Sequence, residues 1–404
     1  MSSPPRLATT ALTATLAVSL ALAGCSIQRT SAGGDTTAAD PSQSVSASPT
    51  SAATISVNVD SGDTAVPVDR LVTVTAADGT LTSVTMRTRK GTPVPGALSA
   101  DKTTWTAAER LESGTGYVVK ATAADTSGRP VSQSLRFRSK TLSLHQQTYP
   151  SMSPLDGQVV GVGFPIMVHF DVPVKRRAEF ERNMHVKSSA GQPGRWHWID
   201  SQTVHYRPRH YWKPGSKITV NLKLNSVPAG NGIYGQEDRR VVFHVGRSVV
   251  ARVNTVSDQM SVFINGALAR TIPITTGQQP KFTTRSGIKV IIEKYRSKTM
   301  NSETIGIDPN GPDGYNIDNV EYAQRVTFSG EFLHAAPWSV GSQGRANVSH
   351  GCTGMSTSNA AWFYAQTRPG DVVEYRGTGR YMTLTNGYGD WNLPWKDWVA
   401  GSAL

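Results

Sequence analysis

The sequence predicts a mainly β protein in which two β-sandwich modules precede a third, mostly β domain. Short runs of alternating apolar and polar residues recur between turn signals from residue 54 onward, a pattern typical of sandwiches. Glycine (37 residues) and proline (23) are frequent, which favours short strands over long helices. The hydrophobic share of 38% excludes a wholly disordered chain, and the lack of long apolar runs excludes a polytopic membrane protein.

The N-terminus has the pattern of an export signal. Arg6 precedes an uncharged stretch, Leu7–Ala23, that is too short and too polar for a transmembrane helix. The stretch leads into Leu22-Ala23-Gly24-Cys25, which resembles a bacterial lipobox, where the cysteine becomes the lipidated first residue. We therefore interpret residues 1–25 as a lipoprotein signal with Cys25 as the lipidation site. A plain signal peptide that is cleaved nearby is the alternative.

Residues 26–53 are predicted to form a flexible linker. Of these 28 residues, 19 are Ser, Thr, Ala or Gly and none is aromatic, so the segment cannot bury enough apolar surface to order itself. As a flexible coil it would have an r.m.s. reach of about 30 Å. Such a segment suits a tether between a membrane and the rest of the chain.

Residues 54–146 and 147–247 are predicted to form the two sandwiches. In the first, strand-like runs cover residues 54–59, 71–75 and 117–122, and Trp105 is the expected core anchor. The second module repeats the theme at an offset of roughly 100 residues, which suggests a duplication. Its expected core aromatics are Trp196, Trp198, Tyr206 and Trp212.

The third domain is predicted to span residues 248–375, and a Trp-rich tail, residues 376–404, is expected to pack on it. An Asn265-Gly266 turn joins two strands into a hairpin. Further strands are expected at residues 287–292, 325–333 and 371–375, and one capped helix at residues 358–366, ended by Pro369-Gly370.

The chain is basic, with a formal net charge of +12, and most of the excess lies before the third domain. Residues 149–249 alone carry 14 basic and 7 acidic side chains. We find no nucleic-acid-binding motif, so nucleic acid is not an expected partner. Two interpretations stay open: a solvated surface, or one that grips an anionic polymer or membrane. The basic run in question is Lys175, Arg176, Arg177 and Arg182.

One cluster in the third domain carries the residue types of nucleophilic catalysis. His334, His350 and Cys352 lie within 19 residues, and Cys352 is the lone mature thiol if Cys25 is lipidated or removed. A lone thiol in an exported protein has no disulfide partner. A thiol becomes a strong nucleophile as the thiolate, and an imidazole can take its proton and later return it to a leaving amine.

Two other interpretations of this cluster remain. Cys352 could be an inert buried residue, or it could join His334 and His350 in a zinc site. The seven other histidines show no metal-ligand spacing. No acidic cluster surrounds Gly230–Tyr234, so we predict no calcium site there. His350, two residues from Cys352, suits an orienting role better than that of the base.

The segment from His334 to Ser349-His350-Gly351-Cys352 resembles the signature of the L,D-transpeptidases of bacterial cell walls, His-x(14–17)-[Ser/Thr]-His-Gly-Cys. Fourteen residues separate His334 from Ser349 here, so residue types, order and spacing all match. The resemblance covers the whole mature chain. Two immunoglobulin-like modules, a YkuD-type catalytic domain and a Trp-rich tail are similar to the wall-anchored class, which uses no cofactor.

The resemblance implies a role for each matching residue. Cys352 would be the nucleophile and His334 the base and then the acid, oriented by the backbone carbonyl of Ala335. Ser349, His350 and Gly351 would shape the loop, whose backbone N–H groups could form an oxyanion hole. The implied substrate contacts are Met300 and Tyr315 in a mobile lid, Ser329 and Gly330 beside the donor stem peptide, Trp338 as a brace, and Gly354.

Gly354 is also where the chain departs from the family pattern. The family often has Asn or Arg two residues after the cysteine, and this chain has glycine. One amide or guanidinium contact to substrate is therefore missing, which corresponds to about 1–3 kcal/mol of binding.

The resemblance implies a peptidoglycan L,D-transpeptidase. It would form 3→3 cross-links through a cysteine acyl-enzyme, release D-Ala from tetrapeptide stems and be inhibited by carbapenems. Its expected partners are donor and acceptor stem peptides, the membrane through the lipid anchor, and anionic wall polymers. We expect it at the outer face of the cytoplasmic membrane, working in the periplasm or cell wall. The alternatives are an L,D-carboxypeptidase or endopeptidase with the same Cys-His site, and a weakly active or non-catalytic wall-binding paralogue.

Overall fold

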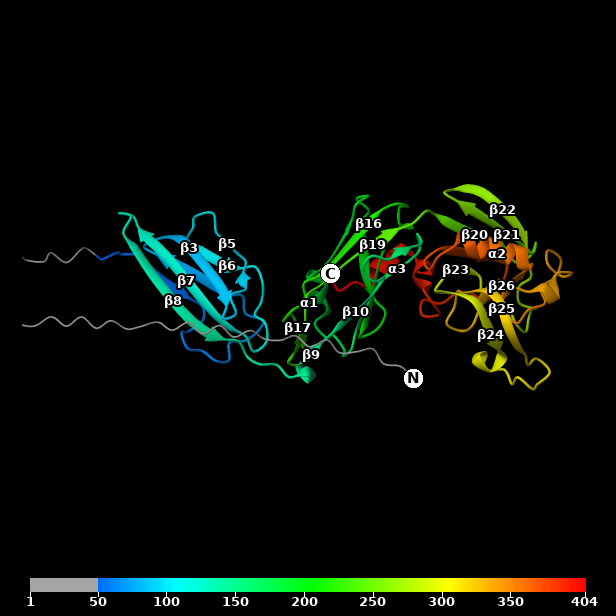
Figure 1. The fold of residues 1–404 in the computed structure, drawn as a ribbon, viewed down its shortest axis with the longest axis horizontal. Helices are drawn as coiled ribbons and strands as arrows, with labels where there is room; N and C mark the ends of the chain where they lie inside the picture. The colour runs from blue at the N-terminus through cyan, green and yellow to red at the C-terminus, as the bar shows by residue number, and fades with distance from the viewer. Residues whose placement is uncertain (1–49) are drawn as a thin grey trace, which may run out of the picture. The chain divides into compact units, whose positions relative to one another are not determined.

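The computed structural model describes residues 50–404 (Figure 1). The predicted signal, the lipidation site Cys25 and all but the last residues of the predicted linker lie outside the described residues. Between residues 50 and 404, no helix is both long enough and apolar enough to span a membrane.

The first module is a sandwich of two four-stranded sheets around Trp105, which is 5% exposed and lies in the core as predicted. Ala53 is also buried in this core, so the module takes in the end of the segment that we expected to be linker. One sheet comprises β1 (Thr54–Val57), β2 (Thr73–Ala77), β6 (Thr104–Ala107) and β5 (Gly96–Leu98). The other comprises β4 (Pro93–Val94), β3 (Gly79–Thr88), β7 (Gly116–Asp125) and β8 (Pro130–Arg138).

The second module is also a sandwich, and all four predicted aromatic residues lie in its core. One sheet has the order β10 (Pro150–Ser153), β12 (Ile166–Phe170), β15 (Thr203–Pro208), β14 (Gly194–Trp198). The other has the order β11 (Val159–Val160), β19 (Arg239–Val245), β16 (Lys217–Leu222), β13 (Met184–Ser188). A small third sheet joins β17 (Pro228–Gly230), β18 (Ile233–Gly235) and β9 (Gln147–Thr148), with η1 (Leu144–Gln146) and α1 (Arg177–Arg182) beside them.

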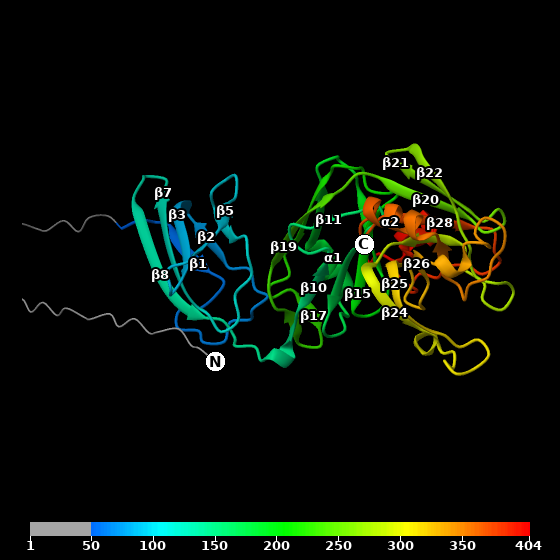
Figure 2. The same ribbon diagram turned by 45° about the vertical axis from the view of Figure 1, so that its right-hand side comes forward.

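The third domain contains two sheets and helix α2 (Thr357–Gln366) (Figure 2). The helix packs Ala360 and Phe363 into a core to which both sheets contribute. The five-stranded sheet has the order β22 (Ala267–Pro273), β21 (Gln259–Ile264), β20 (Val249–Asn254), β28 (Val372–Arg376), β23 (Gly287–Val290). The four-stranded sheet has the order β24 (Glu293–Asn301), β25 (Asn316–Arg325), β26 (Phe332–Ala335), β27 (Thr353–Met355). Short 3-10 helices, η2 (Ser302–Ile305) and η3 (Pro337–Ser339), lie in the connections.

Two predictions about this domain need correction. Residues 325–333 do not form one strand, because β25 ends at Arg325 and a turn reverses the chain before β26. The N–H of Val326 donates to the carbonyl of Glu331 at 3.0 Å, and Gly330 adopts a φ of 94°, which favours glycine. Helix α2 begins before residue 358, because Ser356 is its cap and accepts from the N–H of Asn359.

The C-terminal tail packs on the second module as well as on the third domain. It forms η4 (Gly389–Asn392) and α3 (Trp395–Ala400). The Arg207 guanidinium of the second module lies 4.4 Å from the ring centroid of Trp398 and 4.9 Å from that of Trp391. The Asn392 amide donates to Ile288 in β23 of the third domain at 2.7 Å. We expected only the second of these contacts, because a row of tryptophans does not reveal its partner.

Candidate active site

The two central residues lie on neighbouring parallel strands of the four-stranded sheet. His334 is in β26, and Cys352 directly precedes β27. The register pairs Leu333 with Thr353 and His334 with Gly354. The sheet therefore brings together two residues that are 18 positions apart in the sequence.

His334 is held as a neutral, oriented imidazole. Its Nδ1 lies 2.8 Å from the carbonyl oxygen of Ala335, the contact implied by the resemblance. A carbonyl can only accept, so Nδ1 carries the proton and Nε2 keeps a free lone pair. Burial lowers the pKa of His334, which is 6% exposed, and the ring of Trp338 stacks on it at 5.9 Å. The arrangement leaves Nε2 of His334 able to accept a proton.

Cys352 is held as a thiol beside the Val326–Glu331 turn. Its Sγ lies 3.7 Å from the carbonyl oxygen of Gly330. Burial raises the pKa of the thiol to about 11, although the N–H of Phe332 acts in the opposite direction. Since the thiol and the imidazole are both uncharged at neutral pH, nucleophilic attack requires proton transfer to a base as the bond forms.

The loop before Cys352 is tied by its own hydrogen bonds. Ser349 Oγ donates to the carbonyl of Cys352 at 2.6 Å and accepts from the N–H of Gly351 at 3.1 Å. Thr284 Oγ1 donates to the carbonyl of Gly351 at 2.8 Å. Gly351 has a φ of 125°, which a residue with a side chain rarely adopts. His350 packs its ring between those of Phe282 and Tyr315, at 4.4 and 4.9 Å.

The segment from Asn301 to Tyr315 covers the cysteine. A small cavity of about 90 Å³ opens onto Cys352 and is lined by Met300, Ile305, Tyr315 and Phe332, among others. Burial raises the pKa of Tyr315 to about 12, so its hydroxyl remains a donor. A second cavity of about 190 Å³ lies beside His350 and shares Ile305 and Gly330 with the first. Cys352 therefore lines the first cavity, and the second lies on the other side of Ile305 and Gly330.

The chain is similar to known protein families and to individual proteins. The model of the L,D-transpeptidase catalytic domain matches residues 248–374, and that of a bacterial Ig domain matches residues 63–228. L,D-transpeptidase 2 of Mycobacterium tuberculosis (strain CDC 1551 / Oshkosh) is 37% identical over 350 residues, 86% of this chain and 85% of the relative. L,D-transpeptidase 5 of M. tuberculosis (strain ATCC 25618 / H37Rv) is 32% identical over 340 residues, 82% and 73% of the two chains.

The chain belongs to the L,D-transpeptidase family. The solved structure of the L,D-transpeptidase LdtMt1 in complex with imipenem is 36% identical and has a TM-score of 0.50, covering 56% of this chain and 97% of that one. The predictions of a mainly β fold with immunoglobulin-like and L,D-transpeptidase domains are confirmed. The enzyme class, L,D-transpeptidase, is confirmed as well.

The structure explains why this L,D-transpeptidase has glycine at position 354. A Cβ there would lie 2.9 Å from the Cβ of Ala336 and 3.1 Å from Cγ2 of Thr275, so a larger side chain has no room. An amide still reaches this region, because the Gln343 side chain donates to the carbonyl of Ala336 at 3.0 Å. The bond braces the chain directly after His334 and Ala335.

Ser329 and Gly330, the predicted donor-side stretch, lie in the turn next to Cys352. The backbone N–H and hydroxyl of Ser329 both bond to the side chain of Asn386, at 2.9 Å each. A Cβ at Gly330 would lie 2.4 Å from Cγ2 of Ile305 in the cover. Gly330 is therefore needed where the cover meets the turn.

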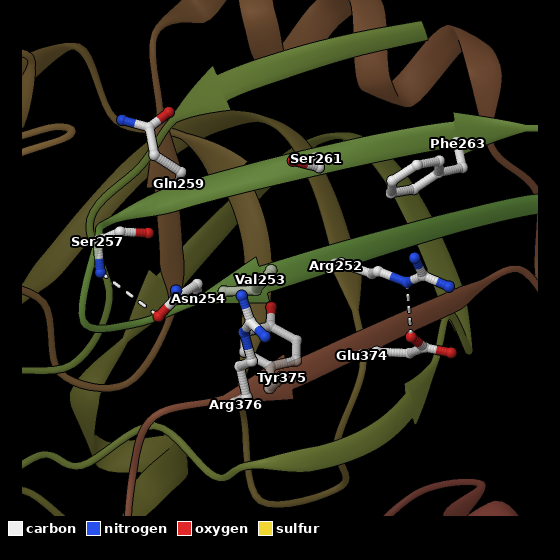
Figure 3. Close-up of a pocket in the computed structure, with 10 residues that line it drawn as sticks. All are labelled: Arg252, Val253, Asn254, Ser257, Gln259, Ser261, Phe263, Glu374, Tyr375 and Arg376. Atoms are coloured by element: carbon white, nitrogen blue, oxygen red, sulfur yellow. Dashed lines mark hydrogen bonds and ion pairs between the residues drawn. The ribbon is translucent and has the colours of Figure 1, made fainter. Parts of the chain in front are cut away.

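A groove of about 610 Å³ on the five-stranded sheet lies away from these residues (Figure 3). It is a groove over β20, β21 and β28, crossed by an ion pair between Arg252 and Glu374 at 3.1 Å. None of the predicted site residues lines it. Cavity volume therefore does not distinguish the candidate active site from the rest of the domain.

Among residues 50–404, no three His, Cys, Asp or Glu side chains are close enough to hold a metal. Sequence reasoning missed four residues that support the loop and its surroundings: Thr284, Lys289, Glu331 and Gln343. Lys289 and Glu331 had a usable signal. Each is a lone charge beside an apolar strand sequence, which predicts a buried partner.

Proposed function

We propose that this L,D-transpeptidase forms 3→3 cross-links in peptidoglycan through a thioester on Cys352. The observation that carries the proposal is that the parallel strands β26 and β27 bring a partly exposed thiol next to a neutral histidine whose Nδ1 is held by the Ala335 carbonyl. The substrates would be tetrapeptide stems with a diamino acid, meso-diaminopimelate, at the third position.

In the first step Cys352 Sγ attacks the carbonyl between the third residue and the terminal D-Ala, and its proton passes to His334. The tetrahedral intermediate then breaks its C–N bond. His334 returns the proton to the departing amine, so D-Ala leaves and the stem remains as a thioester. In the second step the side-chain amine of another stem attacks the thioester. The C–S bond breaks as the new amide, the cross-link, forms. The proton that the amine loses passes through His334 to the sulfur and restores the thiol.

The cover over Cys352 supports transfer to an amine rather than to water. Ile305, Met300 and Tyr315 enclose the cavity beside the sulfur and restrict the access of solvent. A carbapenem carries a strained acyl group of the same polarity as the donor carbonyl, and we propose that it acylates Cys352. The relative LdtMt1, solved in complex with imipenem, supports this proposal.

We propose further that the mature chain is lipidated at Cys25 and works in the cell wall outside the cytoplasmic membrane. Support comes from the sequence of residues 1–25 and from the linker composition. Replacement of Cys25 by Ala would release the protein from the membrane fraction of cells that make it. Retention of the Cys25→Ala variant in the membrane would contradict the anchor.

The test of the cross-linking proposal uses purified disaccharide-tetrapeptide as both donor and acceptor. Tandem mass spectrometry should detect a dimer with a 3→3 bond and free D-Ala, and neither should form with Cys352→Ala. Release of D-Ala with only tripeptide as the second product would mean that water is the acceptor and the output is that of a carboxypeptidase. No turnover by the wild type would contradict the proposal.

A further inference from the structure

A buried ionic cluster lies next to the catalytic loop, and the mechanism above does not use it. The Lys289 ammonium is fully buried and lies 2.5 Å from Glu331, which is 5% exposed. The Arg285 guanidinium bonds the other carboxylate oxygen of Glu331 at 2.9 Å. Burying charges is costly even when they are paired, so a cluster inside a small domain is not explained by stability alone.

Both Glu331 and Lys289 contact residues that neighbour Cys352. Glu331 stands between Gly330 and Phe332, the two residues whose backbone groups face Sγ. Its Cγ lies 3.8 Å from the position that a Cβ on Gly351 would take. The Glu331 carboxylate is thus beside the loop on the Gly351 side.

Lys289 reaches the loop from the other sheet. Its Nζ lies 3.6 Å from the ring centroid of Tyr375. The hydroxyls of Tyr375 and Thr353 are hydrogen-bonded at 2.7 Å, and Thr353 follows Cys352. The ammonium therefore has a packed, buried path to the nucleophile, through which charge acts strongly.

The two charges act on the sulfur in opposite directions. Burial lowers the pKa of the Lys289 ammonium, and its ion pair with Glu331 opposes that shift and favours the charged form. The positive charge of Lys289 lowers the pKa of the Cys352 thiol, and the negative charge of Glu331 raises it. The pKa of His334 is governed by burial and by the Ala335 carbonyl alone. The cluster thus acts on the nucleophile and leaves the base untouched.

We propose that Glu331 and Lys289, braced by Arg285, are positioning residues that set the reactivity of the Cys352 thiol by opposed buried charges. Lys289 favours the thiolate that forms during attack, and Glu331 keeps the resting sulfur protonated. The inference rests on the proposed function in one respect, that Cys352 is the nucleophile. The other titratable and charged groups around the sulfur are His334, His350, Tyr315, Tyr375, Lys298 and Arg325.

The test measures alkylation of Cys352 by iodoacetamide as a function of pH in the mature chain. Three variants are compared with the wild type: Lys289→Met, Glu331→Gln and the double variant. Glu331→Gln should move the midpoint of the profile down by about one pH unit. Lys289→Met should move the midpoint up, which lowers the thiolate fraction at a given pH. Because thiolates of higher pKa are also more nucleophilic, alkylation below the midpoint should slow by only about threefold. The double variant should return close to the wild type.

If the cluster had a purely structural role, loss of either partner would disturb the loop in the same way, and the alkylation midpoint would shift in the same direction in both single variants. Shifts of equal sign in the two single variants, or no shift in either, would overturn the proposal. Lys289→Arg keeps the charge and should keep the wild-type midpoint even if its thermal stability falls. A displaced midpoint in Lys289→Arg would count against a charge effect.

Matched controls come from the second module, where Lys223 and Asp238 form an ion pair at 3.0 Å. Lys223→Met and Asp238→Asn make the same charge changes away from the site and should leave the profile unchanged. Carbapenem addition to each variant separates the two proposals. If every variant forms the adduct and the two single variants shift the alkylation midpoint in opposite directions, both proposals are supported. If no chain forms the adduct, the wild type included, the proposed function is contradicted, and the direction of the alkylation shifts alone decides the charge effect.

Discussion

At the scale of single residues, the site depends on two groups that are uncharged at rest. Burial lowers the pKa of His334 and raises that of Cys352 to about 11, so no ion pair between them forms beforehand at neutral pH. The histidine must then take the proton in the same step in which sulfur attacks. The rate of attack by Cys352 therefore depends more on the geometry of His334 and Ala335 than on a preformed thiolate.

The pH dependence of carbapenem acylation should follow from these directions. Acylation needs neutral His334, and since its pKa is lowered, activity should persist below pH 6.5 and fall only as pH drops through the folded-state pKa. The rate should rise towards alkaline pH, where more thiolate is present. A stopped-flow profile between about pH 5 and 9 measures this. An acid limb centred above 6.5 would contradict the assignment.

Replacement of His334 by Gln should slow acylation about 100-fold or more, because the amide cannot accept the thiol proton. Trp338→Phe is the matched control, since it keeps a ring against His334. Rates of adduct formation by mass spectrometry distinguish the two. Equal rates in His334→Gln and the wild type would show that another group is the base.

Gly354→Asn tests the departure from the family pattern. Because Ala336 and Thr275 fill the space that the new side chain needs, the variant should lose about 1–3 kcal/mol of unfolding free energy and gain no activity. Urea unfolding and carbapenem acylation are the measurements. Higher activity with unchanged stability would mean that the glycine is a true loss of a substrate contact.

At the scale of elements, an ion pair ties the cover over Cys352 to a neighbouring loop. Lys281, from the loop before β23, forms an ion pair with Asp313 in the segment between β24 and β25. The pair is partly exposed, so its contribution is small, about 0–1 kcal/mol. It nevertheless ties two segments that both approach His350.

Asp313→Asn should loosen this cover. We expect faster hydrogen exchange in residues 302–315 and a carbapenem adduct that hydrolyses about twofold faster, because water reaches the thioester more often. Asp318→Asn, in β25, is the control for loss of a nearby carboxylate. An unchanged adduct lifetime together with unchanged hydrogen exchange would contradict the role of the Lys281–Asp313 ion pair in holding the cover.

The elements also show how far sequence reasoning reaches. Alternation and turn residues predicted the Asn265-Gly266 hairpin and the strand at residues 371–375, because these signals are local. The turn after Arg325 was missed, because Val326, Phe328 and Phe332 continue an apolar pattern through it. For the candidate site, residue types and spacing predicted His334 and Cys352, which the structure places on neighbouring strands, whereas Lys289 and Glu331 meet only through sheet packing.

At the scale of the whole molecule, the tail fastens the second module to the third domain. Trp398 is fully buried, and its Nε1 donates to the Arg195 carbonyl at 3.0 Å. His205 and Asp390 pair across the same contact at 2.8 Å. The two parts share one interface of aromatic rings and buried charge, so we expect them to unfold together.

Trp398→Ala should separate them. The loss of a buried tryptophan corresponds to about 3–5 kcal/mol, and calorimetry should then resolve two transitions where the wild type shows one for these parts. Trp338→Ala, which removes an exposed tryptophan, is the control. A single transition at an unchanged temperature would contradict the shared interface.

The central claim is that Cys352 is an acyl-accepting nucleophile served by His334. The most direct measurement is the intact mass of the mature chain after mixing with a carbapenem, with Cys352→Ala beside it. We predict one adduct per wild-type chain, located on Cys352 by peptide mapping, and none on the variant. An adduct of equal yield on Cys352→Ala, or none on a wild-type chain whose thiol still reacts with iodoacetamide, would contradict it.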